Sequence, residues 1–161
     1  MHELALDVGD YVKTRCDYHD VALKLYEEAF FKQIKEWCEE NDLKFTGHLF
    51  MEELLSTLPV TQGSFFSTLR NMHIPGIDYL SDKTGYEPVS LNDTWGSNLA
   101  AKSLSSTAHA IGVKRTLCEI FGGCGWGTSL EKLLNVINWA AACGINFINP
   151  HACHVSLKGL R

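Results

Sequence analysis

The stretch STAHAIGVKRTLCEIFGGCGWG, residues 106–127, contains the transition from a helix to a strand that decides the fold. Its first residues complete a helical pattern that we expect over residues 97–111, and Gly112 follows directly. Glycine is favoured just past a helix end, where the backbone takes the left-handed conformation. The apolar run VKRTLCEIF then predicts a strand centred near Leu117. A helix followed by a strand is therefore the unit to look for elsewhere in the chain.

Further helix-to-strand units recur along the chain. Helical patterns over residues 17–41, 62–71 and 130–143 each precede a strand-like run, and Gly144 follows the last of them. The four predicted strand centres are Phe45, Ile74, Leu117 and Phe147. Successive centres are 29, 43 and 30 residues apart. This spacing is typical of β/α units with one insertion.

Side-chain spacing predicts two details of these helices. In the helix over residues 17–41, apolar residues recur at three- and four-residue steps, which predicts a helix with one apolar face. These residues are Tyr18, Ala22, Leu25, Ala29, Phe30, Ile34 and Trp37. Before the last helix, Thr128 and Glu131 stand three residues apart, which predicts a capping box.

Four parallel strands with intervening helices fit half of an eight-stranded β/α barrel, a TIM barrel, or a small open sheet. We expect a single α/β domain over residues 1–161 that forms a partial TIM barrel and belongs to a longer catalytic domain. A half barrel leaves two strand edges and one sheet face uncovered, so a missing barrel half or a homo-oligomer partner is expected to cover them. Residues 81–98, rich in Gly, Ser, Asn and Asp, form a predicted loop insertion. This insertion is either a wall of the ligand site or a variable surface excursion.

Composition narrows the class of protein. Of the 161 residues, 45% are hydrophobic and 20% are charged, as in ordinary globular domains. A net charge of −5 with scattered Lys and Arg argues against nucleic-acid binding. No apolar run approaches the roughly 20 residues that span a bilayer, and the N-terminus lacks a signal-peptide pattern. We expect a cytoplasmic protein that binds neither nucleic acid nor membrane, or a periplasmic or secreted one if the natural N-terminus is missing.

The six cysteines indicate free thiols, because no C-x-x-C motif occurs and most of them lie in apolar runs. His151, Cys153 and His154 are close in sequence and loosely resemble a zinc site. Zinc needs about four ligands, however, and no second pair of ligands is apparent. An ordinary loop is therefore the favoured interpretation, and a metal-binding protein is a distant third hypothesis.

Polar residues recur at the carboxyl ends of the predicted strands, where a barrel places its active site. His48 and Glu52 follow the first strand, His73 and Asp78 belong to the second, Glu119 ends the third, and Asn149 and His151 end the fourth. We expect these side chains to converge. His48 and His151 also fit the alternative of buried, hydrogen-bonded structural histidines.

Glu119 is the strongest candidate, because an ionised carboxylate inside an apolar run is costly to bury without a partner. Lys114 and Arg115 are alternative partners, but they lie near the opposite end of the strand. Two carboxylates that face each other across a cleft are the minimum apparatus for hydrolysis of a glycosidic bond. Trp126 follows in a glycine-rich loop, where it either stacks on a sugar ring or packs within the loop.

Four segments together resemble large bacterial glycoside hydrolases, close to the α-L-rhamnosidase family numbered 106. They are IKEWCEENDLKFTGHLFMEE, NMHIPGIDYL, LSSTAHAIGVKRTLCEIFGGCGWG and GINFINPHACHVSLKGLR. The resemblance extends over about residues 17–161 and implies the later part of a catalytic TIM barrel. TGHLFMEE is similar to a family pattern T-G-H-L-x-G-E, with Met51 in place of the glycine. CEIFGGCGWG is similar to the pattern E-T-F-G-x-x-G-W, with Ile120 in place of the threonine.

The resemblance implies that Glu52 and Glu119 are the catalytic acid and base. It implies substrate-binding roles for His73, Asp78, Asn149 and His151, to which we add His48 and Trp126 as candidates. Inversion at the sugar is the implied outcome, and calcium is associated with the family, although the sequence requires no cofactor. A retaining β-glycosidase is the alternative enzyme, and a truncated, non-catalytic sugar-binding module is the alternative of another class.

Overall fold

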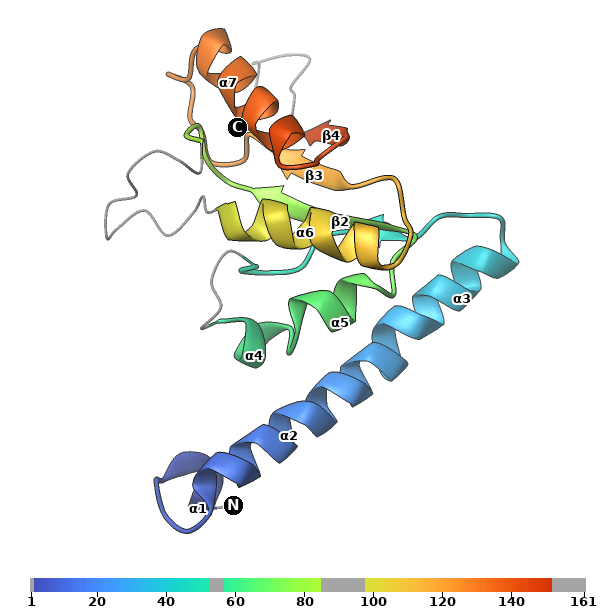
Figure 1. Ribbon diagram of the computed structural model, residues 1–161, viewed down its shortest axis with the longest axis vertical. Helices are drawn as coiled ribbons and strands as arrows, with labels where there is room; N and C mark the ends of the chain where they lie inside the picture. Colours follow the sequence, from blue (N-terminus) through green and yellow to red (C-terminus); the bar gives the residue numbers. More distant parts are fainter. Residues whose placement is uncertain (1, 53–56, 85–97, 152–161) are drawn as a thin grey trace, which may run out of the picture.

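The computed structural model describes residues 2–52, 57–84 and 98–151, which form a mixed α/β fold around a parallel sheet (Figure 1). The strands are β1 (Thr46–Gly47), β2 (Ile74–Tyr79), β3 (Leu117–Ile120) and β4 (Phe147–Pro150), in the order β1-β2-β3-β4. All three strand pairs are parallel. The prediction of four parallel strands joined by helices is confirmed, because three predicted centres lie inside their strands and Phe45 immediately precedes β1.

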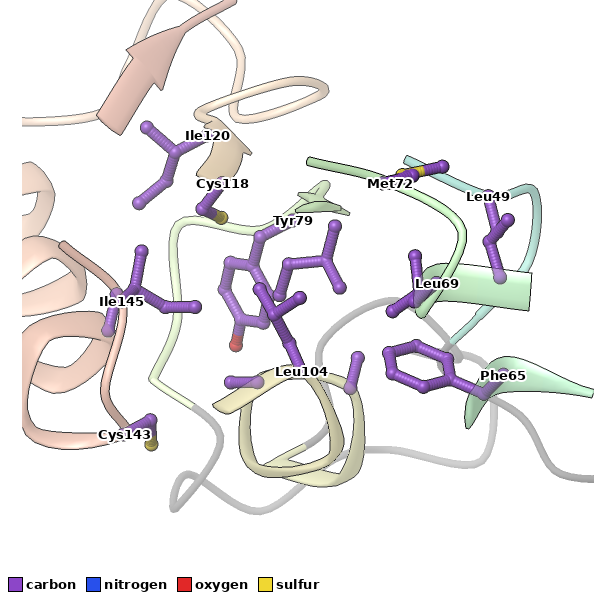
Figure 2. Packing of buried hydrophobic residues seen from close by; sticks show 14 of the residues in the cluster. Leu49, Phe65, Leu69, Met72, Tyr79, Leu104, Cys118, Ile120, Cys143 and Ile145 are labelled. Atoms are coloured by element: carbon purple, nitrogen blue, oxygen red, sulfur yellow. The ribbon is translucent and has the colours of Figure 1, made fainter. Parts of the chain in front are cut away.

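One face of the sheet forms the hydrophobic core. Successive residues of a strand point to opposite faces, so Ile77 and Tyr79 of β2 share a face with Cys118 and Ile120 of β3. Each of these four side chains is at most 1% exposed. The core packs them against helices α5 (Phe65–Leu69), α6 (Asn98–Ala110) and α7 (Leu130–Ala142). Figure 2 shows Tyr79 beside Leu104 of α6, with Phe65 and Leu69 of α5 in the same cluster.

The ends of the helices follow local side-chain chemistry. Gly112 and Gly144 have φ of +73° and +101°, which confirms their place past α6 and α7. The predicted capping box at Thr128 is wrong, because Ser129 is the cap and its hydroxyl accepts a hydrogen bond from the amide of Lys132. The Thr128 hydroxyl instead donates to the carbonyl of Cys124 at 2.7 Å.

The helix predicted over residues 62–71 is shorter than expected. Only α5 lies within the predicted range, and α4 (Leu58–Thr61) precedes it, with Gly63 at φ +78° between the two helices. Ser64 caps α5 by accepting a hydrogen bond from the amide of Ser67. A glycine in the left-handed conformation cannot continue a right-handed helix, which explains the interruption.

The first helix is longer than predicted. It runs through α2 (Tyr11–Tyr26), the π-helical turn η1 (Glu27–Lys32) and α3 (Gln33–Glu40), and α1 (His2–Ala5) precedes it. Its end near residue 41 is confirmed, but its start lies six residues before the predicted residue 17. In Figure 1 the α2 end of this helix extends away from the sheet.

The predicted apolar face of this helix is largely exposed. Tyr18, Leu25 and Trp37 are each more than half exposed, whereas Glu27 and Phe31 are buried. The wider π-helical turn shifts the phase of the residues that follow it relative to those before it. The sheet contact is made by Phe31, whose ring centroid lies 5.9 Å from that of Phe45. The contact with the sheet therefore depends on Phe31, which is not part of the predicted apolar face.

Two expectations concern residues outside the described ranges. Most of the predicted insertion at residues 81–98 lies outside them, as do Cys153 and His154.

Within the described ranges, no helix has the length and apolar character needed to cross a membrane. The five described cysteines, Cys16, Cys38, Cys118, Cys124 and Cys143, are free thiols.

Candidate functional site

Five of the polar residues predicted to meet at the carboxyl ends of the strands do meet there. His48 follows β1, Asp78 lies in β2, Glu119 lies in β3 and His151 follows β4. Nε2 of His48 lies 3.2 Å from one carboxylate oxygen of Glu119, and Nε2 of His151 lies 3.7 Å from the other. Together with Glu52, we call these five residues the carboxylate cluster.

Glu119 faces away from the core because its neighbours in β3, Cys118 and Ile120, point into it. Its side chain is 25% exposed, and each oxygen has its own imidazole partner. Of the two cations near the start of the strand, Arg115 is engaged elsewhere, since its guanidinium lies over the ring of Phe147 at 5.0 Å. The geometry thus places Glu119 in the cluster rather than in a salt bridge to the strand start.

His48 links two acidic residues of the cluster. Its Nδ1 lies 2.6 Å from the carbonyl of Leu49 and 3.9 Å from Oε1 of Glu52. A neutral ring that donates from Nδ1 has no proton on Nε2, so His48 donates to both Leu49 and Glu119 only when it is protonated.

The surroundings of His48 favour its protonated form. Burial by itself lowers the pKa of His48, but the Leu49 carbonyl and the charges of Glu52, Asp78 and Glu119 outweigh burial and raise it. His48 therefore keeps a positive charge to a higher pH than an ordinary histidine does.

Glu52 is the most buried member of the cluster. It is 2% exposed, and its Oε1 accepts a hydrogen bond from the backbone amide of Asp78 at 2.7 Å. Met51, immediately before it, has φ of +58°, a conformation that favours glycine. This left-handed turn directs the Glu52 side chain inward.

Asp78 is half-buried and has a raised pKa. Burial raises the pKa of Asp78, the nearby charge of Glu119 raises it further, and His48 and His151 oppose the shift without cancelling it. Within the described ranges, its buried Oδ1 has no hydrogen-bond partner. Asp78 therefore keeps a proton to a higher pH than an ordinary aspartate.

Asn149 and Trp126 lie at the border of the cluster. Asn149 is exposed on β4 and is the register partner of Glu119. Trp126 is 76% exposed and lines a cavity of about 380 Å³ together with His151, Phe121 and Cys124. His151 belongs to both this cavity and the cluster, so the two are contiguous.

The loop between Glu119 and Trp126 is conformationally strained. Phe121 has φ of +76°, which is unusual for a bulky residue. Strain of this kind concentrates at functional sites, where the surrounding structure holds it in place. Sequence reasoning missed this feature, because nothing in the identity of phenylalanine signals a left-handed backbone.

The structure does not bring His73 to the cluster. His73 directly precedes β2 and so lies at the amino ends of the strands, opposite the cluster. There its Nδ1 accepts a hydrogen bond from the amide of Phe45 at 2.9 Å. Its Nε2 lies 3.0 Å from Oε1 of Glu39 in α3. These contacts attach the end of the long helix to the sheet.

Calcium and zinc are the two metals that the sequence suggests. Calcium takes six to eight oxygen ligands. Across residues 2–52, 57–84 and 98–151, no group of three or more His, Cys, Asp or Glu side chains is arranged to hold a metal ion. His151 faces Glu119, and the other members of the predicted zinc cluster lie outside the described residues. The chemistry considered below involves no metal.

Comparison of the chain with known protein families, curated proteins and solved structures yields no match. The geometry of the carboxylate cluster and the sequence patterns are therefore the basis for a function.

Proposed function

We propose that the protein is a glycoside hydrolase catalytic domain, or a part of one, similar to the α-L-rhamnosidases. The observation that carries this proposal is the convergence of carboxylates around Glu119 at the carboxyl edge of a parallel sheet. In β/α barrels this edge holds the active site. The four described strands are compatible with half of such a barrel.

The chemistry needs two carboxyl groups with different charge states. One donates a proton to the leaving oxygen, and the other attacks the sugar or activates water. Glu119, partly exposed and bordered by two imidazoles, suits the ionised role. The family resemblance names Glu52 as the second group, and Asp78 is the other acidic residue of the cluster.

A carbohydrate substrate is supported by the cavity beside the cluster. The exposed indole of Trp126 offers an apolar face on which a sugar ring stacks. Asn149 and His151 provide polar groups for sugar hydroxyls at the same edge. We assign these three residues, together with His48, to substrate binding.

A substrate bound at the carboxylate cluster would need additional residues to enclose it on the side away from the core. We propose that the remaining strands of a TIM barrel supply it, as a missing barrel half or through a homo-oligomer partner. The exposed stripe that contains Leu25 and Trp37 supports a covering partner. Free thiols at five cysteines fit a reducing compartment, and we propose the cytoplasm.

Hydrolysis of 4-nitrophenyl α-L-rhamnoside by the purified chain tests the proposed function. We expect release of nitrophenol by the wild type and its loss in Glu119→Gln, because the carboxylate cannot be replaced by a neutral amide. Glu36→Gln, at an exposed position of α3, is the matched control and should keep full activity. Rhamnose binding in calorimetry without any hydrolysis would instead identify a non-catalytic sugar-binding module.

A further inference from the structure

Two acidic residues of the cluster, Glu52 and Asp78, are candidates for the partner of Glu119, and their surroundings differ. Glu52 is 2% exposed, and its Oε1 is occupied by the amide of Asp78. A carboxyl group that is closed off from the open face of the sheet cannot reach a glycosidic oxygen. Glu52 is thus better suited to holding other groups than to transferring a proton.

Asp78 lies beside Glu119 on the face of the sheet that is opposite the hydrophobic core. The two are register partners on β2 and β3, so their side chains point to the same side. Neighbouring strands lie about 4.8 Å apart. Carboxyl groups of retaining glycosidases are roughly 5 to 5.5 Å apart, and those of inverting enzymes roughly 6.5 to 9.5 Å. This register is compatible with the short separation of a retaining pair, in place of the inverting pair of Glu52 and Glu119 that the family resemblance implies.

The Oδ1 atom of Asp78 is buried and, within the described part of the chain, lacks a hydrogen-bond partner. Leaving a buried polar atom unpaired is energetically costly. An ionised carboxylate needs hydrogen-bond partners for both of its oxygens, so an unpaired buried oxygen favours the protonated form of Asp78. Asp78 is therefore suited to hold a proton beside Glu119.

We propose, on the basis of the proposed glycoside hydrolase function, that Asp78 is the proton donor that works with Glu119 and that Glu52 is a positioning residue. Asp78 gives its proton to the leaving oxygen as the bond from this oxygen to the anomeric carbon breaks. The Glu119 carboxylate forms the new bond to that carbon. Water then replaces Glu119 and returns a proton to Asp78, and the sugar is released with retained configuration.

The groups around Asp78 are consistent with this role. Glu52 and His48 follow β1, Cys118 and Glu119 belong to β3, and His151 follows β4. Burial, together with the charge of Glu119, keeps Asp78 protonated to a higher pH, against the opposing effect of the two histidines. The Cys118 thiol stays neutral, because burial raises its pKa far above the ordinary value.

Glu52 holds the donor in place. Its Oε1 accepts from the amide of Asp78 and lies 3.9 Å from Nδ1 of His48, which contacts Glu119 through its other nitrogen. Loss of this carboxylate shifts both members of the pair without removing either. Its effect on the rate should therefore not depend on the leaving group.

The test compares two substrates with different leaving groups, methyl α-L-rhamnoside and 2,4-dinitrophenyl α-L-rhamnoside, in the full chain. Dinitrophenolate leaves without a proton, whereas methanol needs one. For Asp78→Asn we expect a loss of about 10² to 10⁴-fold on the methyl glycoside and of less than about tenfold on the dinitrophenyl glycoside. Glu119→Gln should lose activity on both, and Glu52→Gln should lose the same factor on both.

Two further measurements complete the test. The first-formed rhamnose, followed by proton NMR, should keep the α configuration. In protein labelled with ¹³C-aspartate, the Asp78 carboxyl should titrate above an ordinary aspartate in the wild type and at lower pH in Glu119→Gln. This second measurement needs no activity.

Each adverse result has a distinct meaning. A leaving-group-dependent loss in Glu52→Gln but not in Asp78→Asn overturns the assignment of Asp78, as does an ordinary titration of its carboxyl group. An inverted product overturns the attack by Glu119. No hydrolysis of either glycoside by the wild type overturns the proposed function and the donor role together.

Discussion

Met51 has a left-handed backbone immediately before the most buried acidic residue of the cluster. Its φ is +58°, and this conformation costs a residue with a side chain about 1 to 2 kcal/mol. The neighbouring Phe50 is 64% exposed and has no positive φ. The strain at Met51 is therefore local to the turn that places Glu52.

Replacement of Met51 by glycine should relieve this strain. We expect Met51→Gly to be more stable than the control Phe50→Gly by about 1 to 2 kcal/mol, because both gain chain entropy when unfolded but only Met51→Gly loses a strained conformation. Urea unfolding followed by circular dichroism measures both free energies. Equal free energies of unfolding for the two variants would contradict the strained turn.

His48 should make stability depend on pH. Its pKa is raised above 6.5 in the folded state, so its contribution is fully present below pH 6.5 and is lost as the pH rises through the folded pKa. We expect the difference in unfolding free energy between the wild type and His48→Gln to shrink as the pH rises through this window. Urea unfolding at a series of pH values checks it, and a constant difference would contradict a charged His48.

The candidate site was predictable to the extent that it depends on strand ends. Parallel strands end at one edge, so the meeting of His48, Asp78, Glu119 and His151 followed from their positions after apolar runs. The burial of Glu52 was not predictable, because it depends on a left-handed turn at a methionine. His73 was misplaced for a different reason, since it directly precedes β2 and therefore lies at the amino end of that strand, whereas Asp78 lies near its carboxyl end.

At the scale of elements, strands and glycine-ended helices were predicted better than the packing of the long helix. Gly112 and Gly144 mark α6 and α7 through local chemistry that the sequence displays. The buried face of α2 and α3 depends instead on where Phe31 meets the sheet, and apolar periodicity does not contain that contact. The hydroxyl of Ser129, rather than that of Thr128, caps α7 because cap choice depends on the loop that precedes it.

The close approach of β1 and β2 depends on Gly76. A Cβ at this position would collide with the carbonyl of Gly47 and lie 3.2 Å from Cβ of Leu117. We expect Gly76→Ala to lower the free energy of unfolding by about 1 to 3 kcal/mol, because a backbone carbonyl cannot move aside easily.

Gly127→Ala is the matched control for this substitution. A Cβ at Gly127 has no neighbour within 4 Å, so its effect should remain within about 0.5 kcal/mol. Chemical denaturation of the two variants tests the difference. Similar stabilities would show that the two strands adjust to the added methyl group.

At the scale of the whole molecule, the sheet edges are less open than a half barrel suggests. The edge strand β1 has two residues, and short edge strands limit pairing with other chains. In β4, the amides of Phe147 and His151 donate toward β3, and amide directions alternate along a strand. The amide of residue 150 would therefore face outward, and this residue is Pro150. Proline offers no such donor. A partner is therefore expected to bind the sheet face opposite the core or the apolar stripe of the long helix. The strand edges are less suited to this.

Stability should be distributed unevenly along the long helix. None of the described side chains of α2 is buried, whereas Phe31 of η1 is 2% exposed and belongs to the core. Asp7 and Arg15 form an exposed ion pair at 2.8 Å, and pairs of this kind contribute at most about 1 kcal/mol. Deletion of residues 1–10 should therefore change the free energy of unfolding by no more than about 1 kcal/mol.

Phe31→Ala is the contrasting variant, and it should cost about 3 to 5 kcal/mol because it removes a buried aromatic side chain from the contact with Phe45. Hydrogen exchange should agree, with fast exchange in the first turns of α2 and slow exchange in β2 and β3. If the deletion were as costly as Phe31→Ala, the start of the long helix would have to be packed against a part of the molecule, or against a second copy, and the exposed apolar stripe would be the first surface to mutate.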